Sequence, residues 1–281
     1  MLGLFSKNRL FALLALFSLN TMNSSLTASE CCNTSGCGRF YVGAFGGGLR
    51  TDSTKMYQMG TAFFREADQG GPLAVFARGK TKKTSSGLGG IQLGYEWANC
   101  SICCSDWSVA SALELEAFWY SHKIKGHLIN ATDPLRLPEH DFAVSFHTDS
   151  NVYLANVVFS FNSCCFSSLS PYFGLGVGAS RISASGAKSI QVDPIEEGVN
   201  HFNSKRSDTT WAFAAQAKVG LRYNFCNSFH IFGEYRYLYV DYSNFIFGST
   251  VYSFHAPTSQ WDVKVKKTTN NALVFGIQYD L

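Results

Sequence analysis

Hydrophobic and polar residues alternate along eight separate stretches of the chain. The stretches cover residues 39–49, 87–97, 107–123, 151–161, 171–182, 211–223, 229–242 and 272–281. Alternation with a period of two places successive side chains on opposite faces, so it predicts eight β-strands. In the last stretch, Leu273, Phe275 and Ile277 share one face, and Gly276 and Gln278 share the other. Each stretch has the ~9–11 residues that a tilted strand needs to cross a bilayer, or slightly more.

The segments between these strands alternate between short and long. Residues 98–106, 162–170 and 224–228 are short, whereas residues 50–86, 124–150, 183–210 and 243–271 are long and polar. Short turns at one rim and long loops at the other are typical of outer-membrane barrels. The sequence therefore predicts an all-β fold for residues 39–281. We expect an eight-stranded, antiparallel, up-and-down transmembrane β-barrel with short periplasmic turns and four long external loops.

Charged residues gather on the polar faces of the predicted strands. They are Glu96, Glu114, Glu116, Lys218, Arg222, Glu234 and Arg236. The interior of an eight-stranded barrel is filled by side chains, and buried charges need partners. These seven residues are therefore predicted to form a barrel-interior charge network. The alternation alone leaves a second interpretation open, in which they decorate a solvated sheet surface. Gly174, Gly176 and Gly178 also share a face, where we expect them to make room for large neighbours.

The first 28 residues have the pattern of a secretory signal peptide. Lys7 and Arg9 precede the apolar run at residues 10–19, and Ala28 ends a plausible cleavage site. Ten apolar residues are too few to span a bilayer as a helix. A buried N-terminal helix is the alternative interpretation. Cleavage would leave a short cysteine-containing segment at residues 29–38, followed by the barrel domain.

Composition agrees with a β-rich protein that has an apolar exterior. The 281 residues include 24 Phe, 13 Tyr and 25 Gly, and only 15% are charged. Without Lys7 and Arg9 the chain has 21 basic residues (23 − 2) and 20 acidic ones. This near balance argues against a nucleic-acid partner.

Several motifs resemble those of a known family. They are FYVGAFGGG at residues 40–48, ALELEAFWY at 112–120, PYFGLGVG at 171–178, GEYRY at 233–237 and ALVFGIQYDL at 272–281. Their order and spacing are similar to small eight-stranded outer-membrane β-barrel proteins, such as the OmpA transmembrane domain and opacity-type adhesins. The resemblance implies that the last strand is a signal for the barrel-assembly machinery. That signal usually ends in an aromatic residue, whereas this chain ends in Leu281.

Nine cysteines all lie in the N-terminal segment or in the short connections. They are Cys31, Cys32, Cys37, Cys100, Cys103, Cys104, Cys164, Cys165 and Cys226. In the predicted barrel they share the periplasmic rim, in a compartment that oxidises thiols. Disulfides within the chain, disulfides to other envelope proteins and a metal site at residues 100–104 all stay open. The cysteine-rich rim resembles envelope proteins of chlamydia-like bacteria.

No motif for catalysis stands out. Most of the seven histidines fall in or beside the long segments, and His230 is predicted to be an interior hydrogen-bonding residue. A nucleophile with a base within reach is not evident, and we expect no enzymatic activity, no cofactor and no metal.

The expected role is therefore structural or adhesin-like at the cell outer membrane. The expected partners are outer-membrane lipids, the barrel-assembly machinery, other envelope proteins through disulfides, and host surface molecules through the long loops. The alternatives are a narrow channel for small solutes and a soluble barrel that binds a lipophilic ligand.

Overall fold

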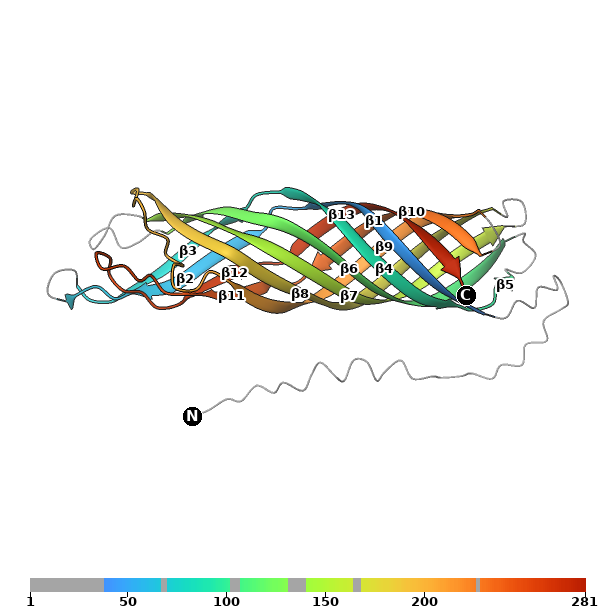
Figure 1. Ribbon diagram of the computed structural model, residues 1–281, viewed down its shortest axis with the longest axis horizontal. Helices are drawn as coiled ribbons and strands as arrows, with labels where there is room; N and C mark the ends of the chain where they lie inside the picture. The colour runs from blue at the N-terminus through green and yellow to red at the C-terminus, as the bar shows by residue number, and fades with distance from the viewer. Residues whose placement is uncertain (1–37, 67–69, 102–106, 131–139, 164–167, 226–227) are drawn as a thin grey trace, which may run out of the picture. The chain divides into compact units, whose positions relative to one another are not determined.

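Eight antiparallel strands close a ring in the computed structural model, which describes residues 38–66, 70–101, 107–130, 140–163, 168–225 and 228–281 (Figure 1). In ring order the strands are β1 (Arg39–Thr51), β4 (Thr84–Glu96), β6 (Trp107–Ile129), β7 (Asp141–Ser163), β8 (Leu169–Asp193), β9 (Asp208–Asn224), β10 (Phe229–Val240) and β13 (Thr268–Asp280). Pairing of β1 with β13, from Tyr41 opposite Asp280 to Thr51 opposite Asn270, joins the two ends of the domain. The up-and-down ring of the predicted fold class is confirmed.

The four long connections lie at one rim, as predicted, but much of their length is β-structure. They contain β2 (Lys55–Ala62), β3 (Leu73–Thr81), β11 (Ser243–Phe247) and β12 (Trp261–Val265). These strands pair in the order β11-β12-β2-β3-β6. Together with residues 121–129, 141–150 and 182–193 of β6, β7 and β8 they form what we call the outer section. The eight-stranded part, to the right of the outer section in Figure 1, is the ring section, with the two-residue strand β5 (Cys100–Ser101) at its far rim.

The two sections have opposite polarity, and strand β6 shows the change within one element. In the ring section, Leu113 and Leu115 face outward and are half exposed, while Glu114 and Glu116 are buried inside. Beyond Trp119 the outward side chains become Ser121, Lys123, Lys125 and His127, and the inward ones become Ile124 and Leu128. Apolar groups leave water and buried charges need partners, so each section suits a different solvent. The ring section is built for lipid and the outer section for water.

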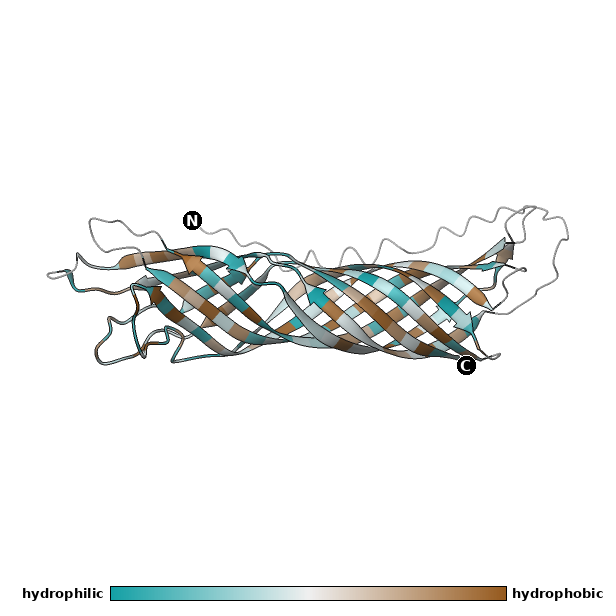
Figure 2. Cartoon of the chain, turned by 90° about the horizontal axis from the view of Figure 1, so that it is seen from above, coloured by the Kyte–Doolittle hydropathy of each residue, from teal (hydrophilic) through white to brown (hydrophobic). Residues whose placement is uncertain are grey.

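Each section accordingly has its own kind of core. The outer section is filled by apolar side chains, which include Met56, Ala77, Leu128, Phe142, Val144, Phe146, Phe202, Phe245, Phe247, Trp261, Val263 and Val265. Their rings interlock: Phe202 stacks on Phe247 at 4.8 Å between centroids, and Phe146 meets Phe245 edge to face at 5.4 Å. This core explains why the long polar connections form strands, because alternate residues of β11 and β12 are buried in it. Figure 2 shows the alternation of hydropathy along the strands.

The outward apolar band has the height of a bilayer core. Trp107 and Trp119 mark its two edges on β6, and they are 12 positions apart (119 − 107). At ~3.3 Å per residue and a tilt of about 45°, this spacing corresponds to a height of about 28 Å. Transmembrane barrels have an apolar band ~25 Å tall, flanked by aromatic girdles. Among the described residues, no helix is long and apolar enough to cross a membrane.

Glycines on β8 make space for polar side chains that cross the ring. A Cβ atom on Gly176 would lie 1.7 Å from Oδ1 of Asn156, and one on Gly174 would lie 3.1 Å from Cε of Lys218. Both distances are shorter than ordinary carbon contacts. The prediction that glycine on this face accommodates large neighbours is confirmed for these two positions.

Candidate functional site: a closed interior and an outer cavity

Acidic residues of β6 meet basic and amide residues of β9 and β10 across the ring. Lys218 Nζ donates to Glu114 Oε1 at 2.5 Å, and Arg236 bridges Glu116 and Glu234. Asn156 on β7 donates to Glu114 at 2.9 Å and to Glu116 at 3.0 Å. The Arg236 guanidinium also lies over the Phe45 ring, 4.1 Å from its centroid. Antiparallel ring closure sets these contacts, because it brings together strands about a hundred residues apart in sequence.

A second group of charges lies nearer the rim that carries the short turns. Glu96 accepts from Arg222 at 2.9 Å and from Arg39 Nη2 at 2.7 Å. Arg39 also pairs with Asp280, whose Oδ2 atom is 2.7 Å from His230 Nε2. His230 is buried, so its predicted role as an interior hydrogen-bonding residue is confirmed.

The seven residues named from the sequence thus all lie on the inner face, in two clusters. The predicted network did not include their neutral partners or the rim pair Arg39 and Asp280, although Asp280 shares the polar face of its strand with Gln278. The hydroxyl of Tyr41 donates to Glu114 at 3.0 Å and that of Tyr172 to Glu234 at 2.7 Å. Both tyrosines lie in predicted strands, and their positions on the inward faces could have identified them as partners of the buried carboxylates. Tyrosine was instead grouped with the apolar residues.

A small cavity lies beside the second group of charges in the ring section. It measures about 20 Å³ and lies among Gln92, Glu96, Arg222 and their neighbours. Two buried polar atoms near it, Gln92 Oε1 and Arg222 Nε, have no hydrogen-bond partner among the described residues. A water molecule needs ~10–15 Å³ of such space and two or more polar partners. The cavity therefore fits a single buried water and is far too small for a continuous pore.

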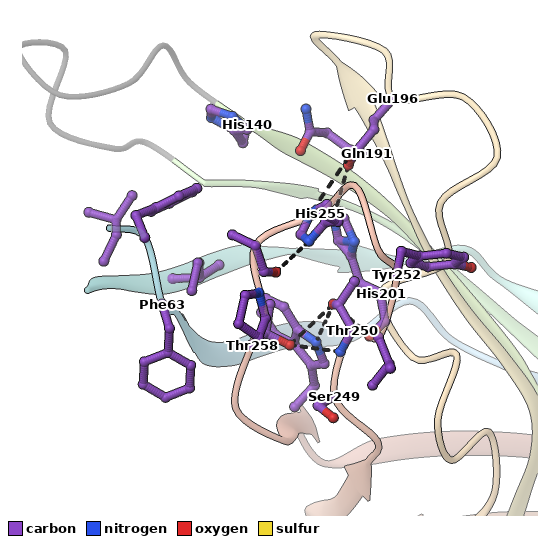
Figure 3. A pocket seen from close by; sticks show the side chains of 18 of the residues that line it. Phe63, His140, Gln191, Glu196, His201, Ser249, Thr250, Tyr252, His255 and Thr258 are labelled. Atoms are coloured by element: carbon purple, nitrogen blue, oxygen red, sulfur yellow. Dashed lines mark hydrogen bonds and ion pairs between the residues drawn. The ribbon is translucent and has the colours of Figure 1, made fainter. Parts of the chain in front are cut away.

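The outer section, in contrast, holds a cavity of about 840 Å³. It is enclosed by the ends of β2 and β3, the start of β7, and the two connections 194–207 and 248–260 (Figure 3). Trp261 and Phe142 line it, and so do three histidines and a glutamate: His140, Glu196, His201 and His255. These residues lie in or beside segments predicted to be long loops, and no role was predicted for them.

His201 is the most deeply buried of these titratable residues. Its ring is stacked on Trp261 at 5.9 Å and meets Phe142 edge to face at 5.1 Å. Its backbone N–H donates to the carbonyl of Ser189, and Thr250 Oγ1 donates to its carbonyl at 3.1 Å. Burial, with repulsion from His255 and His140, lowers the pKa of His201 to about 3. The imidazole is therefore uncharged at neutral pH.

The cysteines fall almost entirely outside the described residues. Cys100 lies in β5 and is exposed. Cys31, Cys32, Cys37, Cys103, Cys104, Cys164, Cys165 and Cys226 lie outside the described residues, as does the predicted signal peptide. Disulfide formation at this rim stays a prediction.

Comparison with solved structures finds other β-barrels. The chain is similar to Neisserial surface protein A (15% identity, 85% of this chain and 96% of that one, TM-score 0.32). It is also similar to the outer membrane protein OprG from Pseudomonas aeruginosa (14%, 87% and 98%, TM-score 0.44). A third similar structure is the outer membrane protease OmpT from Escherichia coli (9%, 85% and 97%, TM-score 0.39). Because these three TM-scores are below 0.5, the fold is assigned from the strand pairing itself. The sequence matches no protein-family model and no curated protein.

Proposed function

We propose that the chain is a non-enzymatic protein of the bacterial outer membrane. In this proposal the ring section is a sealed anchor, and the outer section is held above the bilayer for surface interaction. The reversal of polarity along β6 carries the proposal. Half-exposed Leu113 and Leu115 suit lipid, whereas the outward Lys123 and Lys125 of the same strand suit water. A soluble barrel would expose the apolar band to water, so that alternative is not favoured.

The packed interior supports an anchor rather than a solute channel. Arg236, Lys218 and their carboxylate partners cross the ring, and the cavity beside Glu96 and Arg222 measures only about 20 Å³. We expect the refolded protein to give no steady current in planar bilayers. Heat-modifiable gel mobility of the same sample would prove that the barrel is folded. Stepwise, long-lived conductance from a folded sample would contradict the proposal and favour the channel.

Exposed cations at the junction of the two sections support contact with anionic lipid headgroups. This basic collar comprises Arg50, Lys55, Lys80, Lys82, Lys83, Lys123, Lys125, Lys266 and Lys267. The segments that carry it are joined by hydrogen bonds: the Lys82 N–H donates to the Lys125 carbonyl and the Lys266 N–H to the Lys55 carbonyl. Residues 50–55, 80–83, 123–125 and 266–267 contain one acidic residue, Asp52, which pairs with Lys83 at 3.4 Å.

The collar has the right position for headgroups. On β6, Lys123 follows Trp119 by four residues, or about 9 Å of height at the same tilt. Lysine side chains reach back toward the interface along their apolar stems. We propose that the collar binds the phosphates of outer-membrane lipids. Interaction with host surface molecules would then use the more distal surface of the outer section.

A double variant, Lys123→Gln with Lys125→Gln, tests the collar. Cations near an anionic surface contribute about 1 kcal/mol each, so we expect this variant to lose about 1–2 kcal/mol of stabilisation by anionic vesicles. The measurement is urea unfolding in zwitterionic vesicles with and without 30 mol% (about a third) phosphatidylglycerol. Arg65→Gln with Lys188→Gln, two exposed cations away from the collar, is the matched control. An equal loss in both variants would remove the case for a localised headgroup site.

A further inference from the structure

Three side chains with metal-binding atoms converge on the wall of the outer cavity. His201 Nε2 lies 3.8 Å from Glu196 Oε2, and His255 Nε2 lies 3.6 Å from Glu196 Oε1. One ligand atom from each residue lies within 4.8 Å of the other two. Figure 3 shows Glu196 above the two imidazoles, with all three at the cavity. Glu196 and His201 come from the connection between β8 and β9, and His255 from that between β11 and β12.

The hydrogen bonding of the two histidines leaves nitrogen lone pairs available. His255 Nδ1 lies 2.6 Å from the Ala256 carbonyl oxygen, which can only accept, so Nδ1 carries the hydrogen. In this tautomer the Nε2 atom has a lone pair that can bind a metal. This second contact also orients the ring, as is usual for metal-binding histidines.

His201 is a buried side chain whose hydrogen-bonding capacity is unused. It is 3% exposed, and its Nδ1 atom has no hydrogen-bond partner among the described residues. Its Nε2 atom is too far from Glu196 for a hydrogen bond. A buried polar group without a partner costs about 1–3 kcal/mol. Coordination through Nε2 would use the lone pair that faces Glu196, and it would leave the hydrogen, with this cost, on Nδ1.

We propose that Glu196, His201 and His255 form a site for a divalent transition metal of the Zn²⁺ class. Zinc binds histidine nitrogen at ~2.0–2.1 Å and carboxylate oxygen at ~2.0–2.2 Å, so tetrahedral ligands lie about 3.3–3.5 Å apart. The two Glu196–His distances, which involve different carboxylate oxygens, are longer than this by a few tenths of an ångström. The three ligand atoms lie within 4.8 Å of one another, so the widest separation would shorten by up to about 1.3 Å on binding. Two imidazoles favour Zn²⁺, Ni²⁺ or Cu²⁺ over Ca²⁺ and Mg²⁺, which prefer oxygen. The cavity leaves the fourth position open to water or to a ligand.

The site belongs to the outer section and does not depend on the membrane anchor. Its ligands come from two connections that are held together by other contacts. The Asn200 N–H donates to the Tyr252 hydroxyl at 3.1 Å, and Thr250 Oγ1 donates to the His201 carbonyl. Metal binding would therefore join two connections that already lie against each other.

Titration calorimetry with Zn²⁺ on the folded, untagged, detergent-solubilised protein tests the proposal. The thiols are first reduced and alkylated, because cysteines also bind zinc. We expect one high-affinity site, unaffected by millimolar Ca²⁺ or Mg²⁺. His255→Ala and Glu196→Gln are each expected to weaken binding at least about 100-fold, since losing even an outer-shell partner costs 10–100-fold.

His147→Ala is the matched control, because His147 is exposed on β7 and does not line the cavity. It is expected to bind Zn²⁺ like the unmodified protein. His255 and Glu196 are more exposed than His201, so their variants are the ones expected to fold, and gel mobility verifies this. The proposal is overturned if the unmodified protein binds no Zn²⁺. It is equally overturned if the His255 and Glu196 variants bind as tightly as the control.

Discussion

Replacing Arg236 with methionine is expected to destabilise the folded barrel by about 3–5 kcal/mol, the usual cost of removing one partner from a buried ion pair. Arg236 is 2% exposed and pairs with both Glu116 and Glu234 inside the ring. Methionine keeps much of the volume and the contact with Phe45 but leaves two carboxylates without their cation. Urea unfolding in lipid vesicles, followed by tryptophan fluorescence, measures the loss.

Arg181→Met is the matched control for this substitution. Arg181 is exposed on β8, where it lies opposite Trp211 of β9, and the same exchange there is expected to change stability by less than about 0.5 kcal/mol. A triple variant that adds Glu116→Gln and Glu234→Gln to Arg236→Met should recover part of the loss, since neutral amides need no counter-ion. A loss below 1 kcal/mol for Arg236→Met would mean that these carboxylates reach water, and the sealed interior would be wrong.

Placing an arginine at Leu113 is expected to cost about 2–4 kcal/mol in vesicles, the range found for Arg at the midplane of a transmembrane barrel. Leu113 lies midway between Trp107 and Trp119 and is 49% exposed. The cost arises because the guanidinium would have to leave water for hydrocarbon. Folding yield and urea unfolding in vesicles measure it.

Ser121→Arg provides the comparison on the same strand and the same face, two residues beyond Trp119. At that level the side chain reaches water, and we expect a change within about 0.5 kcal/mol. In a water-soluble protein both substitutions would fall on exposed positions and both would be nearly neutral. Equal effects at Leu113 and Ser121 would therefore refute the membrane-embedded ring section.

The charged residues illustrate how far sequence reasoning could go. Glu114, Glu116, Lys218 and Arg236 were placed on inward faces because alternation is a local property that any strand preserves. The sequence did not predict which of these residues form ion pairs with each other. Lys218 meets Glu114, and Arg236 meets Glu116, only because the ring closes and brings β6 opposite β9 and β10.

Several strands of the outer section were not predicted from the sequence pattern. Residues 55–62 and 261–265 lie in polar segments, and their alternation is short and interrupted. They become strands because each finds a neighbouring strand and a shared apolar core around Phe245 and Trp261. The sequence predicted β6 only as far as residue 123, whereas the strand continues to Ile129. After Tyr120 the outward side chains become polar and the inward ones apolar, so the alternation no longer matches that of the first part of the strand.

The sequence by itself determined the eight ring strands, the two faces of each and most of the charges that share the polar faces, because a period of two is written into neighbouring residues. Only the tertiary structure decided the ion-pair partners, the β-structure of the outer section and the meeting of Glu196, His201 and His255. Those depend on contacts between residues far apart in the chain, and such contacts exist only once the ring and the outer core have formed.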